Sequence, residues 1–364
     1  MDKIPSKFTL PSSRPPKHIE TSKLAINSKQ SRDYSPLPWN HCFSQQLDIR
    51  TSDTDIFHVY TLGTEGPVVL LLHGGGHSAL SWSLLAENLV ESVNCRVLAL
   101  DSRGHGGTST RDDCDLSWQR QVQDAADVFN KMYVHQDDTP APPVVIVGHS
   151  MGGAIAVRLS QERLLTSQAG LVVIDVVEGT AMDALGYVHS FLRGRPKVFK
   201  SVDEAIEWTV RSGQIKNLLS ARISVPGVIS PIKIEEVFGD NNIVTTDIPE
   251  PTHSIDTGAT PVSNVTNNNG YTWRIDLATT ESHWKGWFQG LSSLFLSSLV
   301  PKVLILAGTD RLDKELTLGQ IQGKYQFNVL PKCGHIVHED APSNVADIIG
   351  DFLVRFKLAC KNTH

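Results

Sequence analysis

Ser150 is the residue of this chain whose surroundings most clearly predict chemistry. It lies in Gly148-His149-Ser150-Met151-Gly152, directly after a short apolar run and before a helical pattern. The spacing G-x-S-x-G between a strand and a helix is typical of a nucleophilic serine on a tight turn. Small residues flank the serine because the turn brings backbone segments close together. Ser150 is therefore predicted to attack an electrophilic carbonyl, beside a helix N-terminus that favours negative charge.

A glycine-rich loop, His73-Gly74-Gly75-Gly76, follows another apolar run. Glycines let the backbone approach a substrate closely, and an N–H group in such a loop can bind the oxyanion of a tetrahedral intermediate. Gly75 is the predicted donor from this loop, and Met151, directly after the serine, is the predicted second donor. His73 itself is expected to be structural. The loop is no phosphate-binding loop, because no Gly-Lys-Ser/Thr follows it.

The histidine best placed to accept the proton of the serine is His335. It follows the strand-like residues 326–330 and precedes an amphipathic helical pattern at 343–356. Where a serine of this type is the nucleophile, the histidine comes last in the chain, in the loop after the last strand. His338 is the second candidate, and it is expected at the surface beside Glu339.

Two aspartates could orient this histidine, because each follows an apolar run at the carboxyl end of a predicted strand. Asp175 comes directly after residues 171–174, and Asp310 comes shortly after residues 303–306. Catalytic groups gather at the carboxyl ends of strands in open α/β sheets. Asp310 occupies the more usual position for the acid, and Asp175 lies one strand earlier. Spacing alone leaves both open, with a slight preference for Asp310.

The apolar runs before these residues are typical of strands buried on both faces of a parallel sheet. They lie at Val68–Leu72, Arg96–Leu100, 144–147, 171–174 and 303–306. Helical patterns alternate with them at 82–89, 117–132, 152–161 and 343–356. This alternation predicts an α/β fold with a doubly wound, mostly parallel sheet. Together with the serine turn and the glycine-rich loop, it predicts the α/β-hydrolase fold.

The remaining residues predict a helical cap and two irregular segments. Residues 178–224 and 271–299 are helical and aromatic in pattern, and we expect them to form a cap inserted over the carboxyl edge of the sheet. Residues 1–40 carry a net charge of +4, and residues 225–270 carry a net charge of −5. Both segments are predicted to be mostly disordered, because they bury too little apolar surface to offset the entropy of ordering. Residues 41–364 are otherwise predicted to be a single domain.

The composition excludes several classes of protein. The 364 residues include 33 basic and 39 acidic side chains, a formal net charge of −6. This charge gives no basis for binding nucleic acid or an anionic membrane, and no apolar run is long enough to predict a membrane span. The five cysteines form no C-x-x-C pair, which predicts reduced thiols in the cytoplasm or nucleus. We expect a monomer that uses no metal and no organic cofactor.

Seven stretches of the chain resemble the protein phosphatase methylesterase family, eukaryotic serine hydrolases that demethylate protein phosphatase 2A. They are VLLLHGGGHSALSW at 69–82, GHSMGGAIAV at 148–157, IDVVEGTAMDAL at 174–185, FLRGRPK at 191–197, SGQIKNL at 212–218, AGTDRLDKEL at 307–316 and CGHIVHEDAP at 333–342. Together they span nearly the whole predicted body. The resemblance is specific, because IDVVEGTAMDAL and FLRGRPK are not general features of α/β-hydrolases.

This resemblance implies a triad of Ser150, Asp175 and His335, and so places Asp175 ahead of Asp310. It also implies the substrate, which is the methyl ester of the C-terminal leucine of the phosphatase 2A catalytic subunit. The phosphatase catalytic subunit is thus the expected binding partner, and methanol the expected product, released through an acyl-enzyme. Two other interpretations remain: a broad small-ester hydrolase of the same fold, and a phosphatase-binding regulator with incidental esterase activity.

Overall fold

The computed structural model describes residues 32–134, 139–233 and 269–362. Residues 34–364 form one unit, and residues 1–33 form another, of which only Arg32 and Asp33 are described. Most of the predicted irregular segments, 1–40 and 225–270, thus lie outside the described residues. No helix among the described residues is both long and apolar enough to cross a membrane.

The apolar runs predicted as strands form the central sheet, which has eight strands within the described residues. In sheet order they are β1 (Gln45–Arg50), β2 (Ile56–Leu62), β4 (Arg96–Leu100), β3 (Val68–Leu72), β5 (Val144–His149), β6 (Gln168–Ile174), β9 (Lys302–Leu306) and β10 (Gln326–Val329). The strands from β4 to β10 pair in parallel, and β1 and β2 are antiparallel. The predicted mostly parallel sheet is confirmed.

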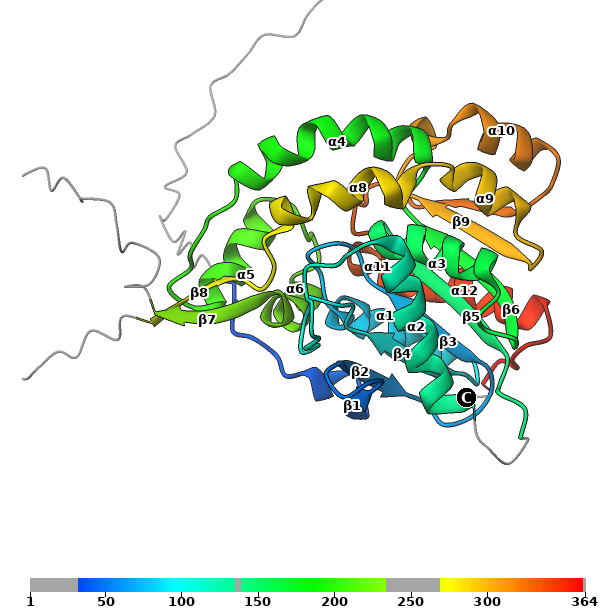
Figure 1. Cartoon of the computed structure of the whole chain (residues 1–364), viewed down its shortest axis with the longest axis horizontal. Helices are drawn as coiled ribbons and strands as arrows, with labels where there is room; N and C mark the ends of the chain where they lie inside the picture. Colours follow the sequence, from blue (N-terminus) through cyan, green and yellow to red (C-terminus); the bar gives the residue numbers. More distant parts are fainter. Residues whose placement is uncertain (1–31, 135–138, 234–268, 363–364) are drawn as a thin grey trace, which may run out of the picture. The chain divides into compact units, whose positions relative to one another are not determined.

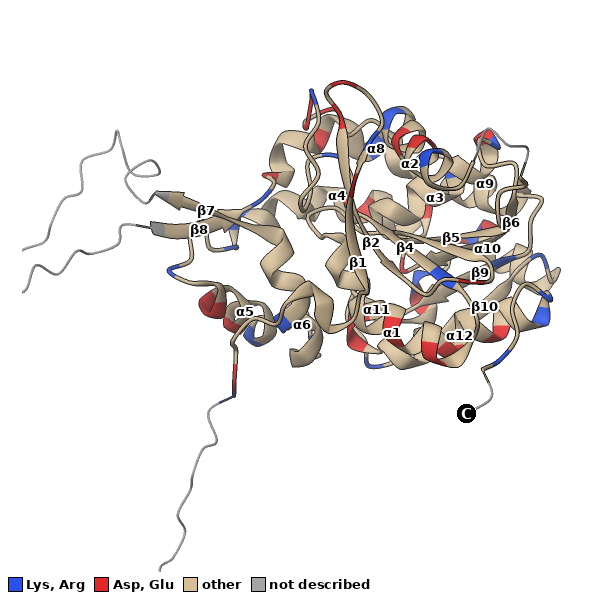
Figure 2. Ribbon diagram, turned by 90° about the horizontal axis from the view of Figure 1, so that it is seen from below, with Lys and Arg blue, Asp and Glu red and all other residues tan. Residues whose placement is uncertain are grey.

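Helices cover both faces of this sheet (Figure 1; Figure 2). α1 (Ser83–Ser92), α11 (Val337–Asp340) and α12 (Pro342–Arg355) lie on one face, and α2 (Trp118–Tyr133) and α3 (Met151–Glu162) lie on the other. Strand β3 shows why its apolar run is continuous. Val68 and Leu70 belong to the core under α2 and α3, whereas Val69 and Leu71 belong to the core under α1 and α12.

A second group of elements lies beyond the carboxyl edge of the sheet. It comprises α4 (Glu178–Arg193), α5 (Val202–Arg211), α6 (Leu218–Ser224), the 3₁₀ helix η3 (Val225–Val228), and the strands β7 (Ile229–Lys233) and β8 (Asn269–Trp273). A small apolar core with Phe199, Ile206 and Ile215 holds α5, α6 and the β7–β8 pair together. These elements form the cap.

The prediction that residues 225–270 form a disordered insertion is wrong at both ends of this segment. Residues 225–233 and 269–270 have regular structure, because β7 and β8 pair antiparallel and Val225 is buried in the cap core. The prediction for residues 1–40 is also too long. Residues 34–40 are described, and the Leu37 N–H donates to the carbonyl oxygen of Arg222 in α6 at 2.9 Å.

The second predicted cap segment, 271–299, belongs for the most part to the hydrolase body. After the 3₁₀ helix η4 (Leu277–Thr280), it forms α8 (Glu281–Phe288) and α9 (Leu291–Ser297). Trp284, Trp287 and Phe295 are buried in the same core as the strands of the sheet. The aromatic pattern of this segment therefore reflects packing on α3. The remaining elements are η1 (Trp39–His41), η2 (Ala79–Trp82), η5 (Thr309–Arg311) and α10 (Lys314–Ile321).

Candidate active site

Ser150 occupies the sharp turn between β5 and α3. Its backbone has φ 52° and ψ −120°, in the range that residues other than glycine rarely adopt. The flanking glycines are needed for this turn, because a Cβ on Gly148 would lie 2.1 Å from the carbonyl oxygen of Gly152. The Ser150 side chain lines a cavity of about 500 Å³ between the sheet and the cap.

His335 lies in the loop after β10 and bridges two side chains. Its Nε2 is 3.0 Å from the Oγ of Ser150, and its Nδ1 is 2.7 Å from the Oδ2 of Asp175. A hydrogen on Nδ1, facing the carboxylate, leaves Nε2 free to accept the proton of the serine. The Asp175 side chain is fully buried, and that of His335 is 51% exposed. The structure thus brings Ser150, His335 and Asp175 into one chain of hydrogen bonds.

Asp175, rather than Asp310, reaches this histidine. The Oδ1 of Asp175 accepts from the N–H of Ala307 at 2.9 Å, and its Oδ2 also contacts the guanidinium of Arg311. Asp310 lies in η5 with an exposed side chain, and the hydrogen bonds of the described residues include none between it and His335. The two aspartates follow the adjacent strands β6 and β9, which explains why spacing could not separate them.

His338 is not the surface residue that we expected. It is 1% exposed, its ring stacks on Trp82 at 3.9 Å between centroids, and neither ring nitrogen has a hydrogen-bond partner among the described residues. Glu339 is also buried and accepts hydrogen bonds from the hydroxyls of Ser220 and Ser224 at 2.8 and 2.7 Å. Both side chains point inward because α11 packs against η2 and the cap helix α6.

The two predicted oxyanion donors lie next to each other. A Cβ on Gly75 would lie 3.7 Å from the Sδ of Met151, and Gly75 lines the same cavity as Ser150. In the part of the chain that the structure describes, neither backbone N–H donates a hydrogen bond to the protein. The neighbouring Gly76 N–H is different, because it donates to the Nε2 of His105 at 2.9 Å. Both predicted donors are thus available to a substrate.

Two buried histidines connect the glycine-rich loop to the segment after β4. His105, which accepts from this loop, also donates from Nδ1 to the carbonyl oxygen of Arg103 at 2.8 Å. His73 donates from Nδ1 to the carbonyl oxygen of Gly74 at 2.8 Å and accepts at Nε2 from the N–H of Ser102 at 3.0 Å. Burial lowers the pKa of His105 to about 4, and that of His73 well below its ordinary value. Both rings are therefore neutral at pH 7, as an accepting Nε2 requires.

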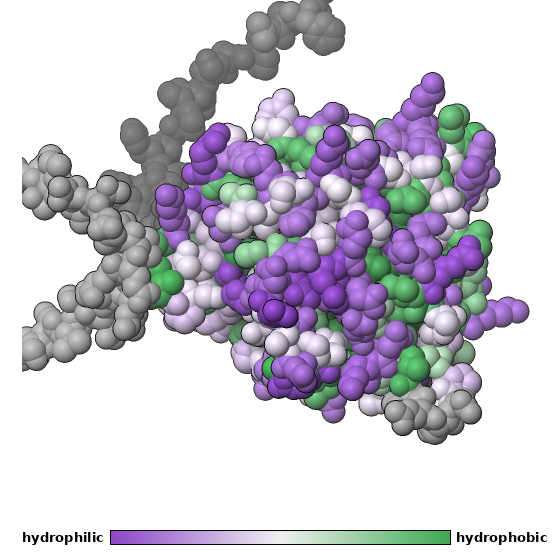
Figure 3. Space-filling view, viewed as in Figure 1, coloured by the Kyte–Doolittle hydropathy of each residue, from purple (hydrophilic) through white to green (hydrophobic). Residues whose placement is uncertain are grey.

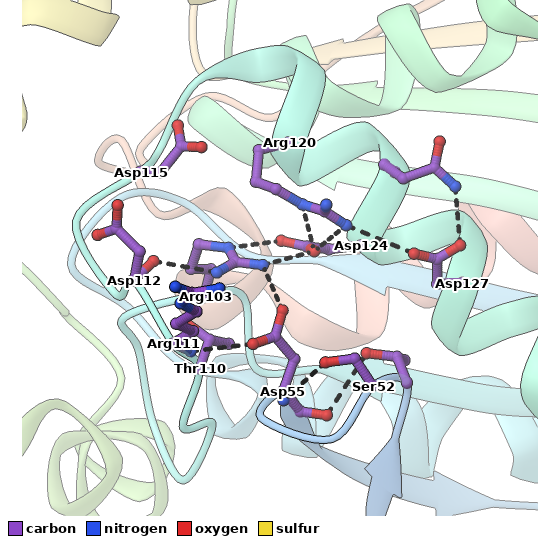
Figure 4. A network of polar contacts seen from close by, with 12 residues as sticks. Ser52, Asp55, Arg103, Thr110, Arg111, Asp112, Asp115, Arg120, Asp124 and Asp127 are labelled. Atoms are coloured by element: carbon purple, nitrogen blue, oxygen red, sulfur yellow. Dashed lines mark hydrogen bonds and ion pairs between the residues drawn. The ribbon is translucent and has the colours of Figure 1, made fainter.

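A polar network anchors the segment that carries His105 (Figure 4). Arg103 donates to both carboxylate oxygens of Asp124 at 2.9 and 2.8 Å and contacts Asp55 at 3.2 Å. Arg120 donates to the same Asp124 carboxylate at 2.8 Å. Arg103 is only 3% exposed, and its paired contact with Asp124 fixes the direction as well as the position of the guanidinium. The network thus fixes the segment whose His105 holds the glycine-rich loop that carries Gly75.

Two residues that sequence reasoning missed hold the loop of His335. His149 donates from Nε2 to the carbonyl oxygen of His335 at 2.9 Å. Asp340 accepts from the N–H groups of Gly334 and Lys216, at 2.6 and 2.8 Å, and so joins this loop to the cap. His149 occupies a variable position of the serine motif, and Asp340 has no motif. Their roles depend on tertiary contacts, because His335 and Lys216, the partners of His149 and Asp340, are distant from them in sequence.

The cavity beside Ser150 is mostly apolar. Its apolar lining side chains come chiefly from the cap and include those of Phe191, Ile215, Val225, Val228, Trp273 and Leu277. Among the described lining residues, Arg195 is the only arginine, lysine or carboxylate. No group of three or more His, Cys, Asp or Glu that could hold a metal is found in the described ranges. Such a cavity fits an apolar chain whose carbonyl reaches the serine.

Comparisons with known proteins decide the family. The alpha/beta hydrolase family model matches residues 69–348. The chain is 47% identical over 370 residues to a Bos taurus protein named protein phosphatase methylesterase 1. The alignment covers 99% of this chain and 96% of the relative. The chain belongs to the protein phosphatase methylesterase family. A probable protein phosphatase methylesterase 1 from Caenorhabditis elegans is 44% identical, and the alignment covers 95% of this chain and 84% of the relative. A protein phosphatase methylesterase 1 from Schizosaccharomyces pombe is 34% identical, and the alignment covers 92% of this chain and 88% of the relative.

Solved structures of hydrolases share the fold of this methylesterase-family chain. A Mycobacterium tuberculosis esterase aligns with a TM-score of 0.59 at 20% identity, over 86% of this chain and 92% of the esterase. The E-2-(acetamidomethylene)succinate hydrolase aligns with a TM-score of 0.61 at 17% identity, over 85% of this chain and 99% of the hydrolase. These likenesses confirm the predicted α/β-hydrolase fold.

Proposed function

We propose that this protein is a serine carboxylesterase that hydrolyses the methyl ester of the C-terminal leucine of the protein phosphatase 2A catalytic subunit. The observation that carries the proposal is the chain of hydrogen bonds from Ser150 through His335 to the buried Asp175. Membership of the methylesterase family supplies the class of substrate. The apolar cavity beside Ser150 fits a leucine side chain at the end of a peptide tail.

The first half of the reaction forms an acyl-enzyme. The Oγ of Ser150 attacks the ester carbonyl while the Nε2 of His335 takes the hydroxyl proton. Asp175 holds the imidazole in the correct tautomer and stabilises the imidazolium. The N–H groups of Gly75 and Met151 bind the negative oxygen of the tetrahedral intermediate. The bond from the carbonyl carbon to the methoxy oxygen then breaks, and His335 returns the proton so that methanol leaves.

The second half of the reaction repeats these steps with water. His335 takes a proton from a water molecule, whose oxygen attacks the acyl carbon, and the same two N–H groups bind the oxyanion. The bond to Ser150 breaks, and the serine oxygen recovers its proton from His335. The products are the free leucine carboxylate and the original enzyme. The enzyme's own side chains and backbone thus supply all the groups that these steps require.

Methanol release from methylated phosphatase catalytic subunit tests this function. Ser150→Ala should lower kcat by about 10⁶-fold, because the three side chains act as a unit. Ser293→Ala is the matched control, because Ser293 is exposed on α9, away from the cavity. It should retain the wild-type rate within about twofold, as expected of an exposed surface substitution. Near wild-type methanol release by Ser150→Ala would refute the mechanism.

The same assay separates the two alternative functions. A broad small-ester hydrolase would cleave short acyl esters rapidly and would treat methylated phosphatase no better than a methylated tail peptide. A phosphatase-binding regulator with incidental esterase activity would form a stable complex with the phosphatase but would release methanol from it no faster than from unrelated methyl esters. The proposed methylesterase should prefer the whole phosphatase, because a flexible tail with a methyl ester offers few contacts for binding.

We further propose that the protein acts as a monomer in the cytoplasm or nucleus. Hydrophobic side chains on the face drawn in Figure 3 lie in scattered groups within a mostly hydrophilic surface, which supports a monomer. All five cysteines are free thiols, which supports a reducing compartment. Light scattering coupled to size-exclusion chromatography, and imaging of the tagged protein in cells, test these two statements.

A further inference from the structure

A guanidinium that forms no ion pair with the described residues lies in the wall of the active-site cavity. Arg195 is partly buried, and its Cζ lies 3.4 Å from the centroid of the Trp273 ring. Its Nε is buried without a hydrogen-bond partner, and the described residues provide no ion pair to the group. Burial lowers the pKa of Arg195 to about 10, so the side chain stays charged at pH 7. Asp276 attracts this charge without forming an ion pair with it, so the partly desolvated guanidinium keeps donors that a ligand can use.

The ring beneath this guanidinium is held firmly. The Nε1 of Trp273 donates to the carbonyl oxygen of Pro196 at 2.7 Å. The rings of Phe199 and Trp208 meet Trp273 edge to face, with centroids 5.3 and 5.7 Å away. The indole therefore offers a fixed surface, on which Arg195 is attracted to the π face without losing its capacity to donate hydrogen bonds. The guanidinium is pre-organised for a ligand.

Arg195 lies between two cavities. With Trp273 and Leu277 it lines both the cavity that holds Ser150 and a neighbouring cavity of about 420 Å³. The second cavity lies between the end of α4, with the residues that follow it, and the chain around β8. Figure 1 shows both elements on the cap side of the molecule. A peptide whose last residue reaches Ser150 could thus continue past Arg195 into the second cavity.

The second cavity is positively charged. Arg193 and Lys197, both exposed, line it together with Arg195. Asp276 is the only carboxylate among its described lining residues, and its Oδ1 accepts from the N–H of Ala278 at the start of η4. His189, at the other end of the lining, already pairs with Glu281 at 2.9 Å. Three cations facing one carboxylate favour an acidic ligand.

From these contacts we propose that Arg195 forms an anion subsite for a carboxylate side chain located a few residues before the esterified end of the substrate. The proposal rests on the proposed function and adds the chemistry of the tail: an apolar esterified end preceded by an acidic residue. A planar guanidinium suits this task because it can donate two parallel hydrogen bonds to one carboxylate.

Methyl-ester peptides of eight residues, ending in leucine and otherwise uncharged, provide the test. A single Glu is placed at each of the five positions before the leucine in turn, and each peptide is compared with its Gln counterpart. The wild-type enzyme should show a kcat/KM for Glu over Gln of about tenfold or more at one or two adjacent positions, the range of one charge-assisted hydrogen bond. In Arg195→Met this ratio should fall to about one.

Arg211→Met is the matched control, because Arg211 is exposed and pairs with Glu207 on the surface of α5. It should keep the wild-type ratio, whereas Arg195→Lys should keep only part of it, because an ammonium cannot bind a carboxylate in the bidentate form. Equal rates for Glu and Gln peptides at every position would overturn the proposal. A ratio that survives in Arg195→Met would also overturn it.

A binding measurement keeps this test independent of turnover. The Ser150→Ala variant is titrated with the same ester peptides, and it should bind the preferred Glu peptide about tenfold more tightly than the Gln peptide. If the wild type releases no methanol from any peptide, the proposed function fails, and the binding ratio alone decides on the subsite. If Arg195→Met weakens only the peptide with a free C-terminal carboxylate, the guanidinium binds the product instead, and the proposal is wrong.

Discussion

Replacement of His105 tests whether the oxyanion loop, which is the glycine-rich loop at residues 73–76, needs its contact with the segment after β4. In His105→Ala, the Gly76 N–H loses its acceptor at 2.9 Å, and the carbonyl oxygen of Arg103 loses its donor at 2.8 Å. Both backbone groups stay in a buried region, because His105 is only 1% exposed. We expect the loop to shift, so that the N–H of Gly75 no longer meets the oxyanion.

The size of the effect follows from these contacts. Two lost hydrogen bonds, with their buried partners left in place, should lower the free energy of unfolding by about 2–4 kcal/mol. Loss of one oxyanion donor lowers kcat by about 10²–10³-fold in enzymes of this type. A displaced donor should have an effect near the lower limit, so we expect kcat to fall about 10²-fold, or about 2.7 kcal/mol of transition-state stabilisation. KM should change much less, because ground-state binding uses the apolar cavity.

Steady-state kinetics of methanol release and chemical denaturation measure the two effects separately. His105→Gln should recover part of kcat, because its amide oxygen can accept from the Gly76 N–H. His41→Ala is the matched control, because His41 is exposed in η1, and it should leave kcat and stability unchanged. If His105→Ala loses stability as expected but keeps the wild-type kcat, the contact only supports the fold, and the reasoning about the oxyanion loop is refuted.

Two further changes test the acid and the buried carboxylate. Asp175→Asn should lower kcat by about 10⁴-fold, because the histidine would adopt the wrong tautomer. Asp310→Asn should keep kcat within about twofold of the wild type. The reverse result would exchange the roles of the two aspartates. Burial raises the pKa of Glu339 from 4.5 to about 8. The folded state then keeps a proton that the unfolded state loses, so the contribution of Glu339 to stability should fall as pH rises between these values, by up to about 1.4 kcal/mol per pH unit. Buried histidines such as His105 contribute the opposite slope below about pH 6.5, because their pKa is lowered. The stability of Glu339→Gln relative to the wild type should therefore rise with pH in denaturation curves from pH 5 to 8.5, and a constant difference would show that Glu339 does not titrate in this way.

The buried strands could be predicted almost residue by residue. Strands β3 and β4 have the predicted bounds, Val68–Leu72 and Arg96–Leu100, because a strand covered on both faces leaves a continuous apolar run. Strands β1 and β2 leave no continuous apolar run to predict, because β1 is exposed along nearly its whole length and β2 has the polar His58 among its buried residues. The β7–β8 pair was missed for another reason: its partners are separated by a long polar segment, so no local pattern indicates their pairing.

The sequence determined the nucleophile by itself, because the turn around Ser150 is a local structure. Its strained backbone needs glycine at fixed offsets, and the strand before it and the helix after it are visible in the residue pattern. Spacing could not select the acid; the family resemblance favours Asp175, and in the tertiary structure it is Asp175 that reaches His335. Asp175 and Asp310 both follow strands that end at the same edge of the sheet, and their local patterns are alike. The position of His335 depends on the loop after β10, and contacts with distant segments hold this loop: His149 binds the carbonyl oxygen of His335, and Asp340 accepts from the N–H of Lys216 in the cap.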